Sequence, residues 1–237
     1  MVINPEVGYH DSPMDALWYA VPYFEQIRDY IRGKGISTTY LYRDRAVKDV
    51  VWYNLSRAKH TFIIGVGHGN NTTYTGYQVR RIFYVGMEDD GYDFTWTRGT
   101  VFLLLSCLTA NQLGPYMVHN AAWSYLGWDI EFGFYLRYGV RKGTDWRNSP
   151  ELLWHKPIEE AFARCATGEY SPEDAYNYIY RKYTEYILNP EIPVRYKELL
   201  RVDRDHMKLI GMRTRPPNVT PPTPVPPPPP ILKAITP

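Results

Sequence analysis

Strand-like and helix-like segments alternate through the first half of the chain. The strand-like segments are short runs of apolar, β-branched or aromatic residues, and they cover 2–7, 36–42, 62–66, 101–105 and 122–128. The segments 14–31 and 46–57 instead repeat apolar residues on one helical face. This order predicts an α/β fold with a mostly parallel sheet, flanked by helices on both faces and connected by right-handed crossovers.

Two further patterns complete the expected fold. Between the third and fourth strands, the Thr- and Tyr-rich pieces 72–77 and 80–85 predict a small antiparallel hairpin. From Pro150 onward the periodicity is helical, with a capping sequence that begins at Ser171 and a last short helix predicted over 194–210. These helices are expected to cover the sheet, and nothing in them indicates catalysis.

The end of the chain has a different composition. Pro216 to Pro237 is dominated by proline, which disfavours helix and sheet and favours the polyproline II conformation. We therefore expect one α/β domain over 1–213 and a disordered, Pro-rich linker or tail over 214–237. A linker in this position suggests a further domain or an anchor, and a tail that binds a partner domain such as SH3 is the alternative.

Composition and charge exclude several classes of protein. With 44% hydrophobic residues, 237 residues suffice for one substantial core, and a net charge of +2 without a Lys/Arg run argues against a nucleic-acid partner. Two cysteines cannot form a disulfide-dense scaffold. No signal peptide and no run of 18 apolar residues is found, so we expect a soluble chain. The compartment and the oligomeric state stay open.

Two of the predicted strands end in chemically useful residues. The run 62–66 leads into Gly67-His68-Gly69, and the run 101–105 leads into Ser106 and Cys107. If these strands are parallel neighbours, the imidazole and the thiol meet at one edge of the sheet, where α/β proteins place their chemistry. A thiol needs such a partner, because the thiolate is the nucleophile. Cys165, in an alanine-rich helical pattern, is expected in the core.

These two motifs, an apolar strand followed by His-Gly and an apolar strand followed by Ser-Cys, resemble those of the clan CD cysteine peptidases. That clan includes caspases, gingipains, legumain and clostripain, and the likeness is greatest to the gingipain-like branch. The histidine precedes the cysteine, as in that clan and unlike the papain order. The resemblance covers about Val7 to Gly139. It implies a caspase-like three-layer sandwich and a cysteine endopeptidase that acts on a peptide or protein.

The resemblance also implies roles for individual residues. Cys107 would be the nucleophile and His68 the general acid, with an oxyanion hole formed by main-chain donors of Gly69 and Cys107. In this clan the segment after the next strand shapes the pocket for the residue before the cleaved bond. Trp128, Asp129 and Glu131 are therefore candidate substrate-binding residues, and either carboxylate could select arginine or lysine. Both could equally be ordinary charges at the end of a strand.

Neither a metal nor a cofactor is required by this mechanism. The acidic residues Glu88, Asp89, Asp90 and Asp93 nevertheless permit a calcium hypothesis, although they lack EF-hand spacing. His10 and Asp11 lie in a loop that the family places beside its active site.

Two alternatives belong to other functional classes. One is a catalytically inactive, caspase-like module that binds a peptide in the same cleft. The other is a flavodoxin-like protein that binds a nucleotide or a flavin, for which Gly67-His68-Gly69 is a poor phosphate-binding turn.

Overall fold

A six-stranded sheet forms the centre of the computed structural model, which describes residues 1–4, 16–136 and 145–219. From one edge to the other its strands are β2 (Tyr40–Tyr42), β1 (Val2–Asn4), β3 (Phe62–Val66), β7 (Val101–Leu105), β8 (Ser124–Trp128) and β9 (Met207–Gly211). The first five are parallel, and β9 pairs antiparallel with β8. The predicted, mostly parallel sheet is therefore confirmed.

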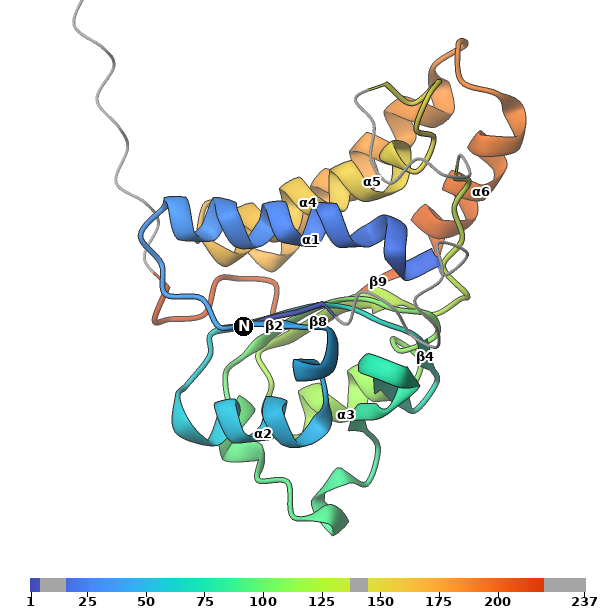
Figure 1. Cartoon of the computed structure of the whole chain (residues 1–237). Helices are drawn as coiled ribbons and strands as arrows, with labels where there is room; N and C mark the ends of the chain where they lie inside the picture. The colour runs from blue at the N-terminus through green and yellow to red at the C-terminus, as the bar shows by residue number, and fades with distance from the viewer. Residues whose placement is uncertain (5–15, 137–144, 220–237) are drawn as a thin grey trace, which may run out of the picture.

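Helices cover both faces of this sheet (Figure 1). One layer contains α1 (Ala16–Gly33), α4 (Leu152–Ala166), α5 (Pro172–Leu188) and α6 (Val194–Asp205), and the opposite layer contains α2 (Lys48–Arg57) and α3 (Leu113–His119). The strands contribute side chains to two hydrophobic clusters, one under each layer of helices. Leu103 and Leu105 pack into the first cluster, and Phe102 and Leu104 pack into the second. Because successive side chains of a strand alternate between faces, a continuous apolar run serves both clusters.

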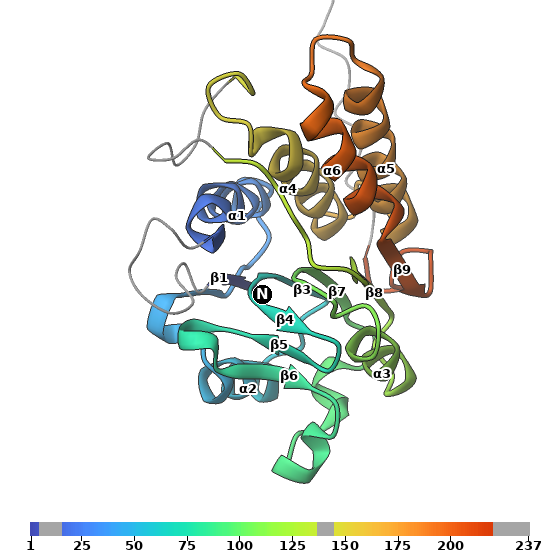
Figure 2. The same ribbon diagram turned by 90° about the vertical axis from the view of Figure 1, so that its right-hand side faces the viewer.

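A second, smaller sheet lies between β3 and β7 in the sequence. It contains β4 (Gly69–Asn70), β5 (Thr73–Thr75) and β6 (Arg81–Tyr84), all antiparallel, and Figure 2 shows it in front of the main sheet. The predicted hairpin is β5 with β6, and β4 adds a third strand directly after His68. Short 3-10 turns at 43–45, 77–79, 87–90 and 94–97 connect these elements.

The prediction of one helix over 194–210 is wrong at its carboxyl end. Helix α6 stops at Asp205, and Met207–Gly211 forms the edge strand β9. Met207 and Leu209 pack into the first cluster while Ile210 packs into the second, which is the two-residue alternation of a strand. Five residues are too few for periodicity alone to separate a strand from the last turns of a helix.

The described chain after β9 contacts two segments that are distant in the sequence. Arg215 donates a hydrogen bond to the Glu169 carbonyl at 3.0 Å, and Asn218 donates one to Thr61 at 3.2 Å. The boundary at 213 remains a prediction, and residues 220–237 lie outside the described ranges. Among the described helices, none combines the length and the apolar content that crossing a membrane requires.

Candidate active site

The register of β3 and β7 places His68 and Cys107 at the same level of the sheet. Val66 pairs with Leu105 at the carboxyl ends of these neighbouring strands, and Gly67 N–H donates to the Leu105 carbonyl at 3.2 Å. Each candidate residue lies two positions beyond that last pair. The condition stated from the sequence, that the two strands are parallel neighbours, is thus met.

Gly69 allows the two loops to approach each other closely. A Cβ at this position would overlap the Ser106 hydroxyl, and it would lie 2.6 Å from the Thr109 methyl group and 2.7 Å from the Cys107 carbonyl oxygen. Real Cβ atoms do not come so near, so this close contact requires glycine. The chain after His68 is therefore packed directly on the main chain around Cys107.

The small sheet fixes the loop that carries His68. Thr75 donates to the His68 carbonyl twice, from its main-chain N–H and from its hydroxyl, both at 2.9 Å. The Tyr74 hydroxyl donates to the Val66 carbonyl at 3.0 Å. These contacts hold the main chain on both sides of Gly67, so the position of His68 depends on β5.

The loop that carries Cys107 is fixed by the end of β8. Leu108 adopts a left-handed φ of 60°, unusual for a residue with a branched side chain, and its N–H donates to the Ile130 carbonyl at 2.9 Å. Asn111 donates to the Asp129 carbonyl and to Asn71 Oδ1, each at 3.0 Å. Asn111 thus links the chain segments that follow β3, β7 and β8.

A cavity of about 60 Å³ lies at the carboxyl ends of β3 and β7, between the sheet and the helices α1 and α4. Its lining includes His68, Cys107 and Ser106 together with the apolar ends of β3 and β7. The remaining walls come from Leu17 and Ala20 on α1, from Phe132 and Phe134 after β8, and from His155 on α4. The structure therefore brings the two predicted catalytic side chains to one cavity. Their catalytic roles remain predictions.

Burial controls the ionisation of Cys107. Desolvation raises the pKa of this thiol, and the charges of Glu131 and Asp203 raise it further. A main-chain hydrogen bond from Phe132 lowers the pKa but does not offset burial. The resting residue near neutral pH is hence a thiol, and a proton must leave the sulfur for it to act as a nucleophile.

The three predicted substrate-binding residues lie in different surroundings. The Trp128 side chain is completely buried, and its indole N–H donates to the Asp203 carbonyl at 2.9 Å. Because it faces the core and not the cavity, its predicted contact with substrate is not supported. Asp129 is paired with His206 at 2.8 Å and with Lys208 at 3.1 Å. Glu131 is exposed, one residue before Phe132 in the cavity wall.

His155 is a cavity residue that the sequence did not indicate. It lies in the first turn of α4 with 1% of its surface exposed, and neither ring nitrogen has a hydrogen-bond partner among the described residues. Its position on the core-facing side of an amphipathic helix was the only available signal, and such a histidine usually packs in the core. The Ser106 hydroxyl, also buried, likewise lacks a partner within the described ranges.

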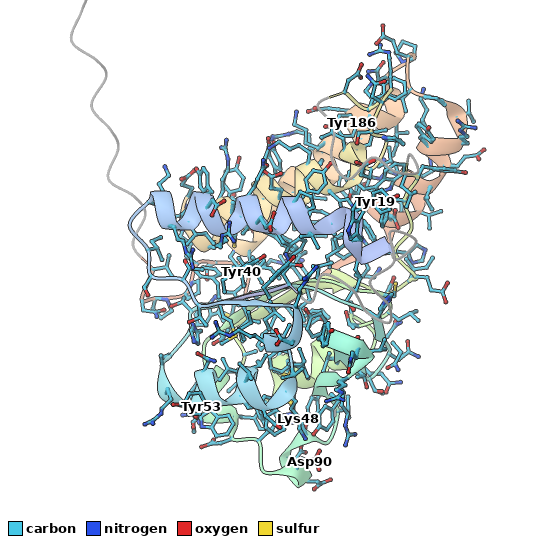
Figure 3. The ribbon with its side chains drawn as sticks, in the orientation of Figure 1. Tyr19, Tyr40, Lys48, Tyr53, Asp90 and Tyr186 are labelled. Carbon is cyan, nitrogen blue, oxygen red and sulfur yellow. The ribbon has the colours of Figure 1, made fainter. Side chains whose placement is uncertain are left out.

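Asp90, one of the acidic residues of the calcium hypothesis, has other contacts. Asp90 accepts from the Tyr84 hydroxyl and pairs with Lys48 at 3.4 Å and with Arg81 at 3.2 Å. Lys48 and Asp90 lie in the layer of α2, at the bottom of Figure 3. In the described part of the chain, no group of three or more His, Cys, Asp or Glu side chains is arranged to hold a metal ion. His10 and Asp11 lie outside the described residues.

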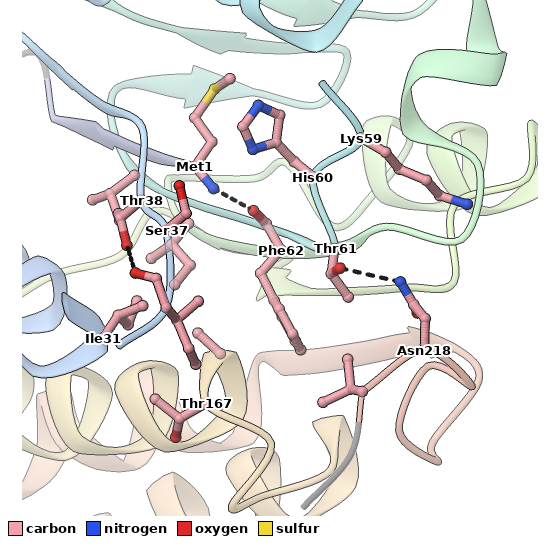
Figure 4. A pocket seen from close by; sticks show the side chains of 15 residues that line it. Met1, Ile31, Ser37, Thr38, Lys59, His60, Thr61, Phe62, Thr167 and Asn218 are labelled. Atoms are coloured by element: carbon pink, nitrogen blue, oxygen red, sulfur yellow. Dashed lines mark hydrogen bonds between the residues drawn. The ribbon is translucent and has the colours of Figure 1, made fainter. Parts of the chain in front are cut away.

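A larger cavity, of about 290 Å³, opens at the other end of the parallel strands. Its lining includes Lys59, His60 and Thr61, which directly precede β3 (Figure 4). The hydrogen bond from Asn218 to Thr61 connects this region to the chain after β9. The opposite strand ends carry His68 and Cys107, so this cavity is separate from the candidate active site.

The comparisons with known proteins bear on the fold. Neither a protein-family model nor a curated protein matches the sequence. A solved structure that is similar is a complex of the pro- and mature domains of RgpB from Porphyromonas gingivalis, a gingipain, with a TM-score of 0.52 at 7% identity. The match covers 82% of this chain but only 43% of that one. At this identity the likeness shows a shared caspase-like α/β fold, and nothing about individual residues.

Proposed function

We propose that this chain is a cysteine endopeptidase in which Cys107 and His68 form the catalytic pair. The observation that carries the proposal is their common cavity at the carboxyl ends of two adjacent parallel strands. The similarity to a gingipain fold supports the same class of enzyme. A peptide or protein substrate follows from that class.

The raised pKa of Cys107 defines what His68 must do. Since the resting sulfur is protonated, His68 would accept the thiol proton as Sγ attacks the carbonyl carbon of the substrate. The resulting imidazolium would then donate that proton to the leaving amine, and the histidine would later activate water for release of the acyl group. Main-chain N–H groups of Gly69 and Cys107 are the proposed donors to the oxyanion.

The sequence offered two carboxylates that could bind arginine or lysine before the cleaved bond, and one of them remains a candidate. Asp129 already contacts His206, after α6, and Lys208, on β9, whereas Glu131 is exposed beside the cavity wall. Binding of a basic side chain of the substrate would therefore depend on Glu131. The inactive, peptide-binding module is the alternative to catalysis, because it needs the same cavity but no proton transfer.

Turnover of fluorogenic peptides that differ only at the residue before the scissile bond tests the proposal. Cys107→Ala and His68→Ala are each expected to lower turnover by about a thousandfold or more. Cys165→Ala, which changes the buried cysteine of α4, is the matched control and should retain activity. If the wild-type protein cleaves no peptide and its Cys107 is inert to alkylation at neutral pH, the binding module is favoured.

A further inference from the structure

The wall of the cavity beside Cys107 is apolar and aromatic in its described part. Leu17, Ala20, Phe132 and Phe134 line it, and no carboxylate is among its lining residues in the described ranges. A cation that enters such a cavity loses its hydration without gaining a counter-charge, which is strongly unfavourable. The lining therefore disfavours an arginine or lysine side chain.

His155 gives this cavity one specific polar group. Its imidazole is surrounded by aromatic rings, with centroids 4.5 Å from Phe134 and 5.1 Å from Tyr23. Burial lowers the pKa of His155 to about 3, so the ring is neutral at pH 7. A neutral imidazole has one N–H donor and one acceptor nitrogen, and neither is used by a described residue.

Buried polar groups without a partner are uncommon, because each loses its hydrogen bonds to water and gains none in return. His155 and Ser106 both show this property, and both line the same cavity. A ligand that supplies a donor or an acceptor would therefore be favoured over an apolar ligand of the same size. Such discrimination is strong in sites that leave polar groups unpaired when the wrong ligand binds.

Two buried carboxyl groups near His155, one at the N-cap of α4 and one within the helix, do not alter this conclusion. Glu151 and Glu159 lie one helical turn before and after His155, but neither is among the cavity-lining residues. The Ser149 hydroxyl donates to Glu151, and Lys156 pairs with Glu159 at 2.9 Å. Each carboxyl group thus has a contact of its own.

We infer that this cavity receives the side chain preceding the scissile bond, and that it selects an uncharged side chain ending in a hydrogen-bonding group, such as a carboxamide, which pairs with His155. The inference rests on the proposed function for its place in the reaction. It assigns His155 as a specificity-determining residue. It also predicts a different preference from the earlier expectation, which was a basic substrate side chain before the scissile bond.

Binding to the Cys107→Ala protein tests this inference without requiring catalysis. Calorimetric titration compares capped tetrapeptides that are identical except for Gln, Leu or Arg at the position before the scissile bond. We expect the Gln peptide to bind about tenfold more tightly than the Leu peptide, and the Arg peptide to bind least well. Tightest binding of the Arg peptide, equal binding of Gln and Leu peptides, or no binding of any peptide would each overturn the inference.

A second variant assigns the selectivity to His155. Adding His155→Phe to Cys107→Ala keeps an aromatic ring but removes both nitrogens, so the Gln-to-Leu ratio should fall to about one. His60→Phe, at the opposite strand ends, is the matched control and should leave the ratio unchanged. Should His155→Phe fail to fold, the three-peptide comparison still decides the inference. Peptides that bind in this order but are not cleaved by the wild type would refute only the proposed function.

Discussion

Gly69 lies so close to Cys107 that a Cβ on the glycine would come within 2.7 Å of the cysteine carbonyl oxygen. This contact joins the loop after β3 to the loop after β7, and it lies one residue beyond His68. The relative position of His68 and Cys107 thus depends on a glycine, a residue that has no side chain to take part in the reaction.

Replacing Gly69 with alanine is expected to lower the free energy of unfolding by about 1–3 kcal/mol, because the methyl group overlaps main-chain and side-chain atoms. It should also alter the alkylation rate of Cys107, since the two loops must separate. Chemical denaturation and timed iodoacetamide labelling measure these effects. Gly33→Ala is the control: a Cβ there meets nothing within 4 Å, and alanine near the end of α1 should be neutral or slightly stabilising. Equal stability of Gly69→Ala and wild type would contradict the packing described above.

Thr75→Val removes the hydroxyl that donates to the His68 carbonyl while keeping the shape of the side chain. The main-chain bond from Thr75 remains, so we expect a loss of about 1 kcal/mol of stability and a lower peptide-cleavage rate, without unfolding. Thr73→Val, on the same strand, is the comparison and should affect cleavage much less. Identical cleavage rates for the two variants would show that β5 does not position the histidine.

The thiol of Cys107 should alkylate slowly near neutral pH and faster as the pH rises, because burial and two carboxylates raise its pKa. Glu131→Gln removes one of these negative charges, so the pH midpoint of alkylation should move down by a few tenths of a unit. Mass spectrometry of labelled Cys107 across a pH series provides the midpoint. Glu198→Gln, an exposed carboxylate on α6, serves as the control. An unchanged or higher midpoint in Glu131→Gln would remove Glu131 from the surroundings of the sulfur.

Asp203 is completely buried, and its carboxylate accepts a hydrogen bond from Gly133 N–H at 3.2 Å, next to the cavity wall. Desolvation raises its pKa well above 3.8, so the folded chain binds this proton more tightly than the unfolded chain. Its contribution to stability is therefore complete at pH values below 3.8 and is lost as the pH rises toward the folded-state pKa.

Asp203→Asn keeps the acceptor oxygen but cannot ionise. Its stability should fall less with rising pH than that of the wild type, by at most about 1.4 kcal/mol per pH unit. Urea unfolding at several pH values gives both curves, with Asp205→Asn, its exposed neighbour, as the control. Parallel curves for Asp203→Asn and wild type would mean that the buried carboxyl does not titrate differently on folding.

The sequence by itself determined the central strands and the residues that follow them. The runs 62–66 and 101–105 are buried on both faces, so their apolar composition alone marks β3 and β7 with their observed bounds. Those runs also indicated that His68 and Cys107 meet at one edge of the sheet if the two strands are parallel neighbours, which their pairing in the structure supplies. The helix start at Ser171 was also readable, since its capping box is a local interaction.

Only the tertiary structure decided which groups surround the thiol. Asp129 looked available to a substrate, but its partners His206 and Lys208 come from the end of α6 and from β9, far away in the sequence. His155 looked like an ordinary core residue of α4, and it lines the cavity because that helix packs against α1 and the end of the sheet. Pairing and burial of this kind depend on contacts between distant segments, which local periodicity does not record.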